Sequence, residues 1–81
     1  MEILYFAWVR ERIGLPREAI QTNAKTVMEL VDELRGKEER YAVAFSDLTA
    51  LRVAVDQVLT DFDAPLDGVR EVAFFPPMTG G

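Results

Sequence analysis

The pattern of apolar and polar residues along this chain predicts one helix and several strands. Apolar residues recur three or four positions apart in one segment, at Val27, Leu30, Val31 and Leu34. This spacing gives a helix one apolar side. Thr26 precedes the segment and Glu29 stands three residues later, which is the pattern of an N-terminal capping box. Gly36 is placed to end the helix.

Runs of β-branched, aromatic and aliphatic residues predict strands in the other parts of the chain. We expect these strands at 3–9, 18–22, 51–55, 58–59 and 69–75. Asp56 and Gln57 are suited to a tight turn between the third strand and the fourth. The remaining segments are expected as one helical turn at 10–13 closed by Gly14, a less regular helical stretch at 38–45, and a loop at 61–68. The pattern therefore predicts an α+β domain with one main helix.

The first and last predicted strands are apolar on both faces. In the first strand Ile3, Tyr5 and Ala7 alternate with Leu4, Phe6 and Trp8, and in the last Val72 and Phe74 alternate with Ala73 and Phe75. A single helix covers only one face of a sheet, so the second apolar set is left on an open face. Exposed apolar patches of this kind commonly mark a partner surface. The alternative is that segments 38–45 and 61–68 fold over this face and bury it.

Composition narrows the chemistry that the chain can perform. The 81 residues include no cysteine and no histidine, so no disulfide, thiolate zinc site or histidine base is available, and we expect no metal site. A net charge of −5 argues against binding of nucleic acid and means that a partner has to supply any basic pocket for a phosphate group. The apolar run at 3–9 is too short to cross a membrane and lacks the flanks of a signal peptide, so we expect a cytoplasmic protein.

The last ten residues, VAFFPPMTGG, join an apolar strand to a tail without large side chains at its end. Pro76 and Pro77 cannot donate to a strand ladder, so they end the strand. We therefore divide the chain into a folded domain at 1–75 and a flexible tail at 76–81. By itself this tail has two interpretations, a frayed terminus or a working part of the molecule.

Three segments together resemble one protein family. Phe6-Ala7-Trp8-Val9-Arg10-Glu11, Val55-Asp56-Gln57 and the ending Glu71 to Gly81 are similar to the small subunits of molybdopterin synthase, which are ubiquitin-like, β-grasp sulfur carriers. The resemblance covers the whole chain and is weakest between residues 13 and 47. It implies a mixed sheet of four to five strands with one main helix packed on one face.

The resemblance also implies a mechanism that needs no side-chain nucleophile. The carboxylate of Gly81 would be adenylated by an ATP-dependent activating enzyme, converted to a thiocarboxylate, and inserted into the large synthase subunit, where its sulfur passes to cyclic pyranopterin monophosphate. No cofactor would be bound, and the assembly would be a heterotetramer of two large and two small subunits. Gly80, without a Cβ, suits a thread that enters narrow pockets. Pro76 and Pro77 would stiffen the base of this thread.

Carried over by position, the resemblance assigns a partner surface. It includes Phe6, Leu59 and Phe75, with Pro76, Pro77, Met78 and Thr79 of the tail and Arg10 near the first strand. For Arg10 a plain surface cation is an equally good interpretation. Asp56 departs from the asparagine more usual at its position; it can still accept the hydrogen bonds of a turn, but any role as an amide donor is in doubt.

Three other functions share parts of this pattern. A sulfur carrier of the thiamine pathway has the same fold and Gly-Gly ending, but such chains tend to be shorter and lack the Phe-Phe-Pro-Pro approach. A ubiquitin-like modifier would be found joined through Gly81 to lysines of many proteins. A plain interaction module would have an inert tail.

Overall fold

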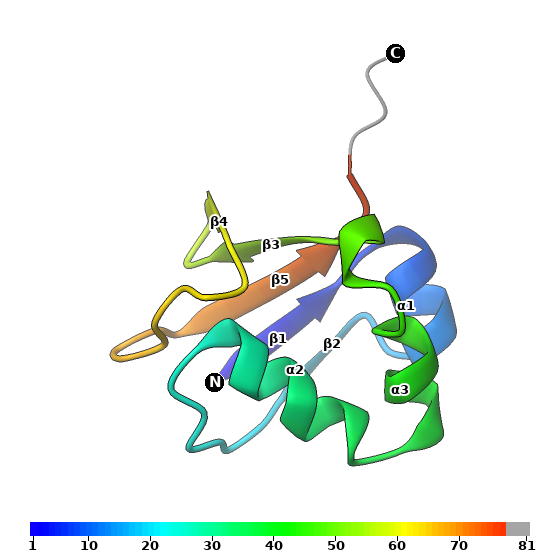
Figure 1. The fold of residues 1–81 in the computed structure, drawn as a ribbon, viewed down its shortest axis with the longest axis horizontal. Coiled ribbons are helices and arrows are strands. Elements are labelled where there is room, and N and C mark those ends of the chain that lie inside the picture. The colour runs from blue at the N-terminus through cyan, green and yellow to red at the C-terminus, as the bar shows by residue number, and fades with distance from the viewer. Residues whose placement is uncertain (78–81) are drawn as a thin grey trace.

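Five strands form one mixed sheet in the computed structural model, which describes residues 1–77 (Figure 1). The strands are β1 (Glu2–Tyr5), β2 (Arg17–Ala19), β3 (Arg52–Val55), β4 (Val58–Thr60) and β5 (Glu71–Phe75). Their spatial order is β2-β1-β5-β3-β4. The last strand, β5, is therefore central, and it pairs parallel to β1 and antiparallel to β3. This arrangement confirms the expected α+β class and the number of strands.

The helices are α1 (Ala7–Ile13), α2 (Val27–Arg35), α3 (Glu39–Ala44) and a short 3-10 turn at Leu48–Ala50. The capping box at the start of α2 is confirmed, because Thr26 Oγ1 accepts a hydrogen bond from the Glu29 N–H at 3.2 Å. The Glu29 carboxylate accepts in return from the N–H of Lys25, one residue before the cap, at 3.1 Å. The buried side of α2 is the predicted stripe. The irregular helical stretch expected at 38–45 is also present, as α3.

The predicted strand at 3–9 is wrong beyond Tyr5. Phe6 is still extended, but Ala7 has φ of +52°, a left-handed conformation that is uncommon for a residue with a Cβ. It turns the chain out of the sheet and into α1, which buries Val9 and Ile13, four residues apart. The helical turn expected at 10–13 is therefore only the second half of a longer helix.

Two further strands have a boundary two or more residues away from the predicted one. β2 begins and ends earlier than the expected 18–22, because the segment after Ile20 leaves the sheet toward α2, where Thr22 Oγ1 donates to a Glu33 carboxylate oxygen at 2.8 Å. β5 begins at Glu71 rather than at 69, since the loop before it still folds against the core through Leu66 and Val69.

All three helices and the 61–68 loop pack on the same face of the sheet. Phe74 of β5 lies in this core with Tyr5 at 6.3 Å and Phe45 at 4.9 Å between ring centroids. Phe45 follows α3, and Leu66 of the loop joins the same buried cluster. The segments that could have folded over the other face therefore do not, and that alternative is wrong. Within residues 1–77, the second face of the sheet has no helix on it.

One polar cluster ties α3 to the edge of the sheet. Glu18 of β2 accepts hydrogen bonds from the hydroxyls of Tyr5 at 2.7 Å and Tyr41 at 2.6 Å. Burial alone would raise the pKa of Glu18, but these two hydrogen bonds and the charges of Lys37 and Arg40 outweigh it and leave that pKa below its usual value. Burial and the same carboxylate raise the pKa of Tyr41 to about 12. Glu18 is thus held ionised.

Candidate functional site: the open sheet face and the base of the tail

The open face is the side of the sheet that no helix of the described chain covers, and an apolar row crosses it. The strand registers place Leu4, Ala73, Ala54 and Leu59 side by side on four neighbouring strands. Successive residues of a strand point to opposite faces, and the residues next to Leu4, Ala73 and Ala54 in sequence lie in the core or pack against it. The two residues in the middle of the row are alanines, whereas both ends carry leucine. The row is therefore low in its middle and higher at its ends.

Phe6 and Phe75 extend this row toward the end of β5. Tyr5 pairs with Phe74, and the next residue, Phe6, donates its N–H to the Phe74 carbonyl at 3.1 Å. Phe6 and Phe75 therefore follow one another on adjacent strands of the open face. Phe75 is half-buried, and 46% of Phe6 is exposed. The left-handed turn at Ala7 fixes the place at which Phe6 leaves the sheet.

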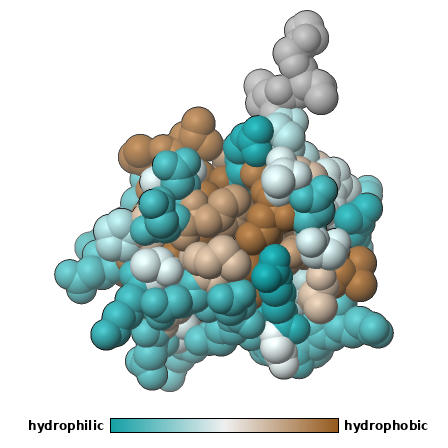
Figure 2. All heavy atoms as spheres, in the orientation of Figure 1, coloured by the Kyte–Doolittle hydropathy of each residue, from teal (hydrophilic) through white to brown (hydrophobic). Residues whose placement is uncertain are grey.

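Four large apolar residues of the described chain are strongly exposed: Phe6 at 46%, Val43 at 50%, Val58 at 65% and Leu59 at 67%. Phe6 and Leu59 belong to the open face. Val58 is the neighbour of Leu59 in β4, and the strand alternation turns it to the opposite side of the hairpin. Figure 2 shows apolar residues gathered where β4 lies and in the middle of the visible face, with hydrophilic residues around them. The two most exposed of the four, Val58 and Leu59, thus lie in the β3–β4 hairpin.

The sequence places Phe6, Leu59 and Phe75 in one partner surface, and the fold brings all three to one face. Ala54 is part of the same row but was missed, because a lone alanine in a short strand gives no signal until its register is known. Trp8 was expected on the outward set and is not there. It lies in α1, with the Arg12 guanidinium 4.5 Å from its ring centroid.

The tail continues directly from the central strand. Pro76 and Pro77 follow Phe75 and are half-buried, so the described part of the tail begins beside the two aromatic residues of the open face. Met78, Thr79, Gly80 and Gly81 lie outside the described residues. The predicted partner contacts of Met78 and Thr79, the threading role of Gly80 and the sulfur-carrying role of Gly81 remain predictions.

Asp56 holds the turn at the far end of the open face. Its Oδ1 accepts from the N–H groups of Arg70 at 3.0 Å and Glu71 at 2.9 Å, and its own N–H donates to the Glu71 carbonyl at 2.9 Å. Asp56 and Gln57 have φ of +48° and +71°, the geometry of a two-residue hairpin turn. The predicted tight turn is confirmed, and both side-chain bonds need only an acceptor, which aspartate provides as well as asparagine.

Arg10 lies on the exposed side of α1, one turn after Phe6. Its N–H donates to the Phe6 carbonyl at 3.4 Å, and its side chain forms no ion pair with any residue from 1 to 77. This position next to the aromatic end of the open face suits a partner contact, but it suits a solvated cation equally well.

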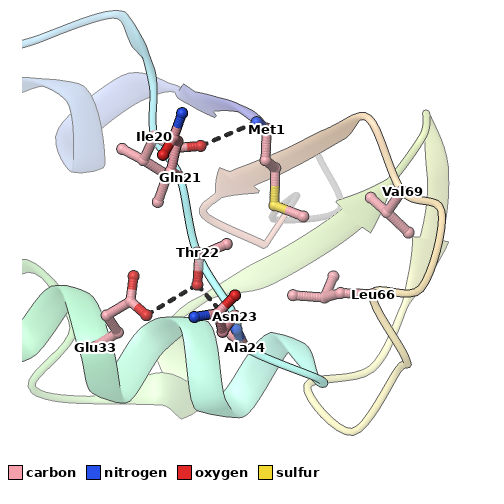
Figure 3. A pocket seen from close by; sticks show the side chains of 9 residues that line it. All are labelled: Met1, Ile20, Gln21, Thr22, Asn23, Ala24, Glu33, Leu66 and Val69. Carbon is pink, nitrogen blue, oxygen red and sulfur yellow. Dashed lines mark hydrogen bonds between the residues drawn. The ribbon is translucent and has the colours of Figure 1, made fainter.

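A separate hollow lies between the start of β1 and α2 (Figure 3). It has a volume of about 730 Å³, and several of its polar groups bond to one another. The Met1 ammonium donates to the Ile20 carbonyl at 2.9 Å, and Thr22 Oγ1 accepts from the Ala24 N–H at 3.0 Å while it donates to Glu33. These bonds anchor the chain after β2.

In residues 1–77 no cluster of three or more acidic side chains is arranged to hold a metal ion, and no helix is long and apolar enough to cross a membrane.

A sequence model of the ThiS family matches residues 3–81. The chain belongs to the ThiS family. It is 41% identical over 81 residues to the molybdopterin synthase sulfur carrier subunit of Escherichia coli, with 100% of this chain and 99% of that protein covered. The protein of the same name from Haemophilus influenzae is 32% identical, with the same coverage. The relatives therefore agree with the resemblance that the sequence motifs indicate.

Solved structures show the same fold at lower identity. SAMP1 from Haloferax volcanii superposes with a TM-score of 0.77 and 23% identity, over 100% of this chain and 98% of that one. A protein from Pyrococcus furiosus described as putative molybdopterin converting factor, subunit 1, gives a TM-score of 0.69 and 21% identity, over 95% of each chain. The fold is the ubiquitin-like β-grasp, as the resemblance implies.

Proposed function

We propose that this protein is a sulfur carrier of molybdopterin biosynthesis and that it carries sulfur on the carboxylate of Gly81. The observation that supports this most is the full-length similarity to molybdopterin synthase sulfur carrier subunits. The structure adds an apolar open face that ends in Phe6 and Phe75, directly beside the first residues of the tail. A carrier of this kind needs such a face for docking and a tail for delivery.

The chemistry uses the chain terminus rather than a side chain. A carboxylate is ionised at neutral pH and is a poor electrophile. An activating enzyme would let this carboxylate attack the α-phosphate of ATP, which releases pyrophosphate and leaves an acyl-adenylate. A sulfur nucleophile would then displace AMP and leave a thiocarboxylate. Because the sequence holds no cysteine and no histidine, no thiol or imidazole side chain competes for these steps.

The open face would dock first on the activating enzyme and then on the large synthase subunit, with Leu59, Phe6 and Phe75 as its apolar contacts. In the large subunit the thiocarboxylate would give its sulfur to cyclic pyranopterin monophosphate. Two large and two small subunits would form the working assembly. The small protein supplies sulfur and docking, whereas the partner supplies the basic pocket for the phosphate, which a chain of net charge −5 does not offer.

The decisive experiment measures intact mass after incubation with activating enzyme, ATP and a sulfur donor. The mass should rise by one oxygen-to-sulfur exchange in the C-terminal peptide, and addition of the large subunit and pyranopterin should reverse this rise. Deletion of Gly81, or one extra residue after it, should abolish both changes and leave the circular dichroism spectrum unchanged. A tail-extended protein that still accepts and donates sulfur would show that the carrier atom lies elsewhere.

The same experiment distinguishes a molybdopterin sulfur carrier from a thiamine-pathway carrier, and a cell extract tests for a ubiquitin-like modifier. A carrier for the thiamine pathway would become thiocarboxylated but would yield no product with the large synthase subunit. A ubiquitin-like modifier would be found in isopeptide linkage from Gly81 to lysine side chains of other proteins in a cell extract.

A further inference from the structure

The outer edge of β2 presents backbone groups that no described residue uses. In its ladder with β1, the Tyr5 N–H donates to the Pro16 carbonyl and the Ile20 N–H donates to the Met1 carbonyl, both at 2.9 Å. Bonded and non-bonded pairs alternate along an antiparallel ladder. It follows that the N–H and C=O groups of Arg17 and Ala19 point away from β1, outward from the sheet. Both residues are exposed.

A groove runs along this edge, between β2 and α2. It has a volume of about 590 Å³ and is lined mostly by apolar surface, with Ile20 from the strand side and Leu34 from the helix side. An extended segment that paired with the outward groups of β2 would direct every second side chain toward the helix side of the sheet. These side chains would enter the groove. The edge therefore offers backbone groups for hydrogen bonding and a groove for side chains, which are the two requirements for binding of an added strand.

The chain at the end of β2 is already held in place by hydrogen bonds. Figure 3 shows the Met1 amino group and the Thr22 hydroxyl fixing the chain on both sides of Gln21. Gln21 lies between the two bonded residues and lines the groove. A docking segment would therefore not have to order this part of the protein, which removes one cost of binding.

Charge distinguishes between possible occupants of the groove. Asp32 and Glu33 line it from α2, and both are exposed. The lysine that lines it, Lys37, lies 3.8 Å from a carboxylate oxygen of Glu18 and is partly neutralised by it. Asp32 in turn lies 3.4 Å from the Arg35 guanidinium, whereas Glu33 forms no ion pair within residues 1–77. The rim is therefore acidic, chiefly through Glu33. A second copy of this chain would bring the same acidic helix and another net charge of −5, which disfavours pairing of two β2 edges.

We propose that the β2 edge binds an extended segment of a partner protein in which apolar residues alternate with lysine or arginine. The segment adds to the sheet as a sixth strand beside β2, its apolar side chains enter the groove, and its cations face Asp32 and Glu33. β2 and β4 are opposite edges of the sheet, and the tail follows the central β5. This site is therefore separate from the open face and the tail, and it does not depend on the sulfur-carrier function.

A capped peptide of alternating valine and lysine is a suitable probe, with amide chemical shifts of the full chain as the readout. We expect the largest shifts at Arg17, Ala19 and Gln21, with Leu59 unchanged. N-methylation of the central peptide amides keeps every side chain and charge but removes donors for the ladder. It should weaken binding by about fivefold or more. Equal binding of the N-methylated peptide, or shifts centred on the open face, would overturn the proposal.

Two variants test the protein side. Ala19→Pro removes one outward N–H that the β1–β2 ladder does not use, and proline is tolerated at such edge positions; it should abolish the shifts at β2. The double variant Asp32→Asn with Glu33→Gln should weaken binding by about threefold to tenfold. Asp61→Asn with Asp63→Asn changes the net charge equally outside the groove and should not. Equal losses of peptide affinity in the two double variants would contradict a specific acidic rim. A dimer in sedimentation that Ala19→Pro dissociates would overturn the proposed occupant, because the edge would then bind a second copy of this chain.

Discussion

Leu59→Ala and Val58→Ala form a matched pair that tests whether the open face is the docking surface. The two residues are neighbours in β4 and are exposed to nearly the same degree, 67% for Leu59 and 65% for Val58. The strand alternation directs Leu59 to the open face and Val58 to the opposite side. The two substitutions therefore differ mainly in which face loses apolar area.

The expected effect follows from the exposed part of Leu59. Complete burial of a leucine side chain stabilises by about 1.5–3 kcal/mol. A partner can cover only the two-thirds that are still exposed, so Leu59→Ala should weaken docking by about 1–2 kcal/mol, or roughly fivefold to thirtyfold in Kd. Val58→Ala should change Kd less than about twofold, because its side chain lies outside the contact.

Titration calorimetry with the purified large synthase subunit measures both affinities, and thermal unfolding of each variant shows whether the fold is intact. Both variants should unfold at similar temperatures, because each removes a side chain that is mostly in solvent. Similar Kd values for Leu59→Ala, Val58→Ala and the unmodified chain would refute the assignment of the open face. A larger loss for Val58→Ala would place the interface on the helix side of the hairpin.

Three further predictions concern stability. Asp56→Ala should cost about 1–3 kcal/mol in thermal or urea unfolding because two N–H groups lose their acceptor, whereas Asp56→Asn should stay within about 0.5 kcal/mol; equal losses would mean that the carboxylate charge matters. Gln57→Gly should stabilise by at most about 1 kcal/mol, since glycine adopts the left-handed conformation freely, and destabilisation would contradict the turn geometry. The third concerns Glu18, whose pKa in the fold lies below its usual value. The stability that its charge contributes is therefore present above the ordinary carboxyl pKa and is lost as pH falls through the folded value. In urea unfolding, the stability advantage of the unmodified chain over Glu18→Gln should shrink between neutral and acidic pH, and a constant difference would show that charge is not involved.

The sequence was sufficient for α2 because every signal for that helix is local. Thr26 and Glu29 cap it, one stripe faces the core, and Gly36 ends it. The signal for α1 is different. The run from Ile3 to Val9 is apolar at every position, so it has no period by which strand and helix can be told apart. The left-handed turn at Ala7 and the packing of α1 against α3 make the residues after Phe6 helical. Neither feature can be read from the sequence.

The sequence predicts the aromatic residues of the open face but not the alanines that connect them to Leu59. Phe6 and Phe75 stand in strands that are apolar on both faces, which already indicates an open patch. The row through Ala73 and Ala54 to Leu59 exists only because β5 enters the sheet between β1 and β3. Strand order of this kind depends on pairing between residues far apart in the chain, and no local pattern specifies it.

The central place of β5 also has a mechanical consequence. A pull on the tail enters the fold through a strand that is paired at four positions with β1 and at four with β3. Because the force runs along the strand, both ladders have to fail together in shear instead of opening one bond at a time. An edge strand in the same place would peel away. The tail can therefore be drawn into a deep pocket, or withdrawn from it, while the body of the protein follows as one rigid piece.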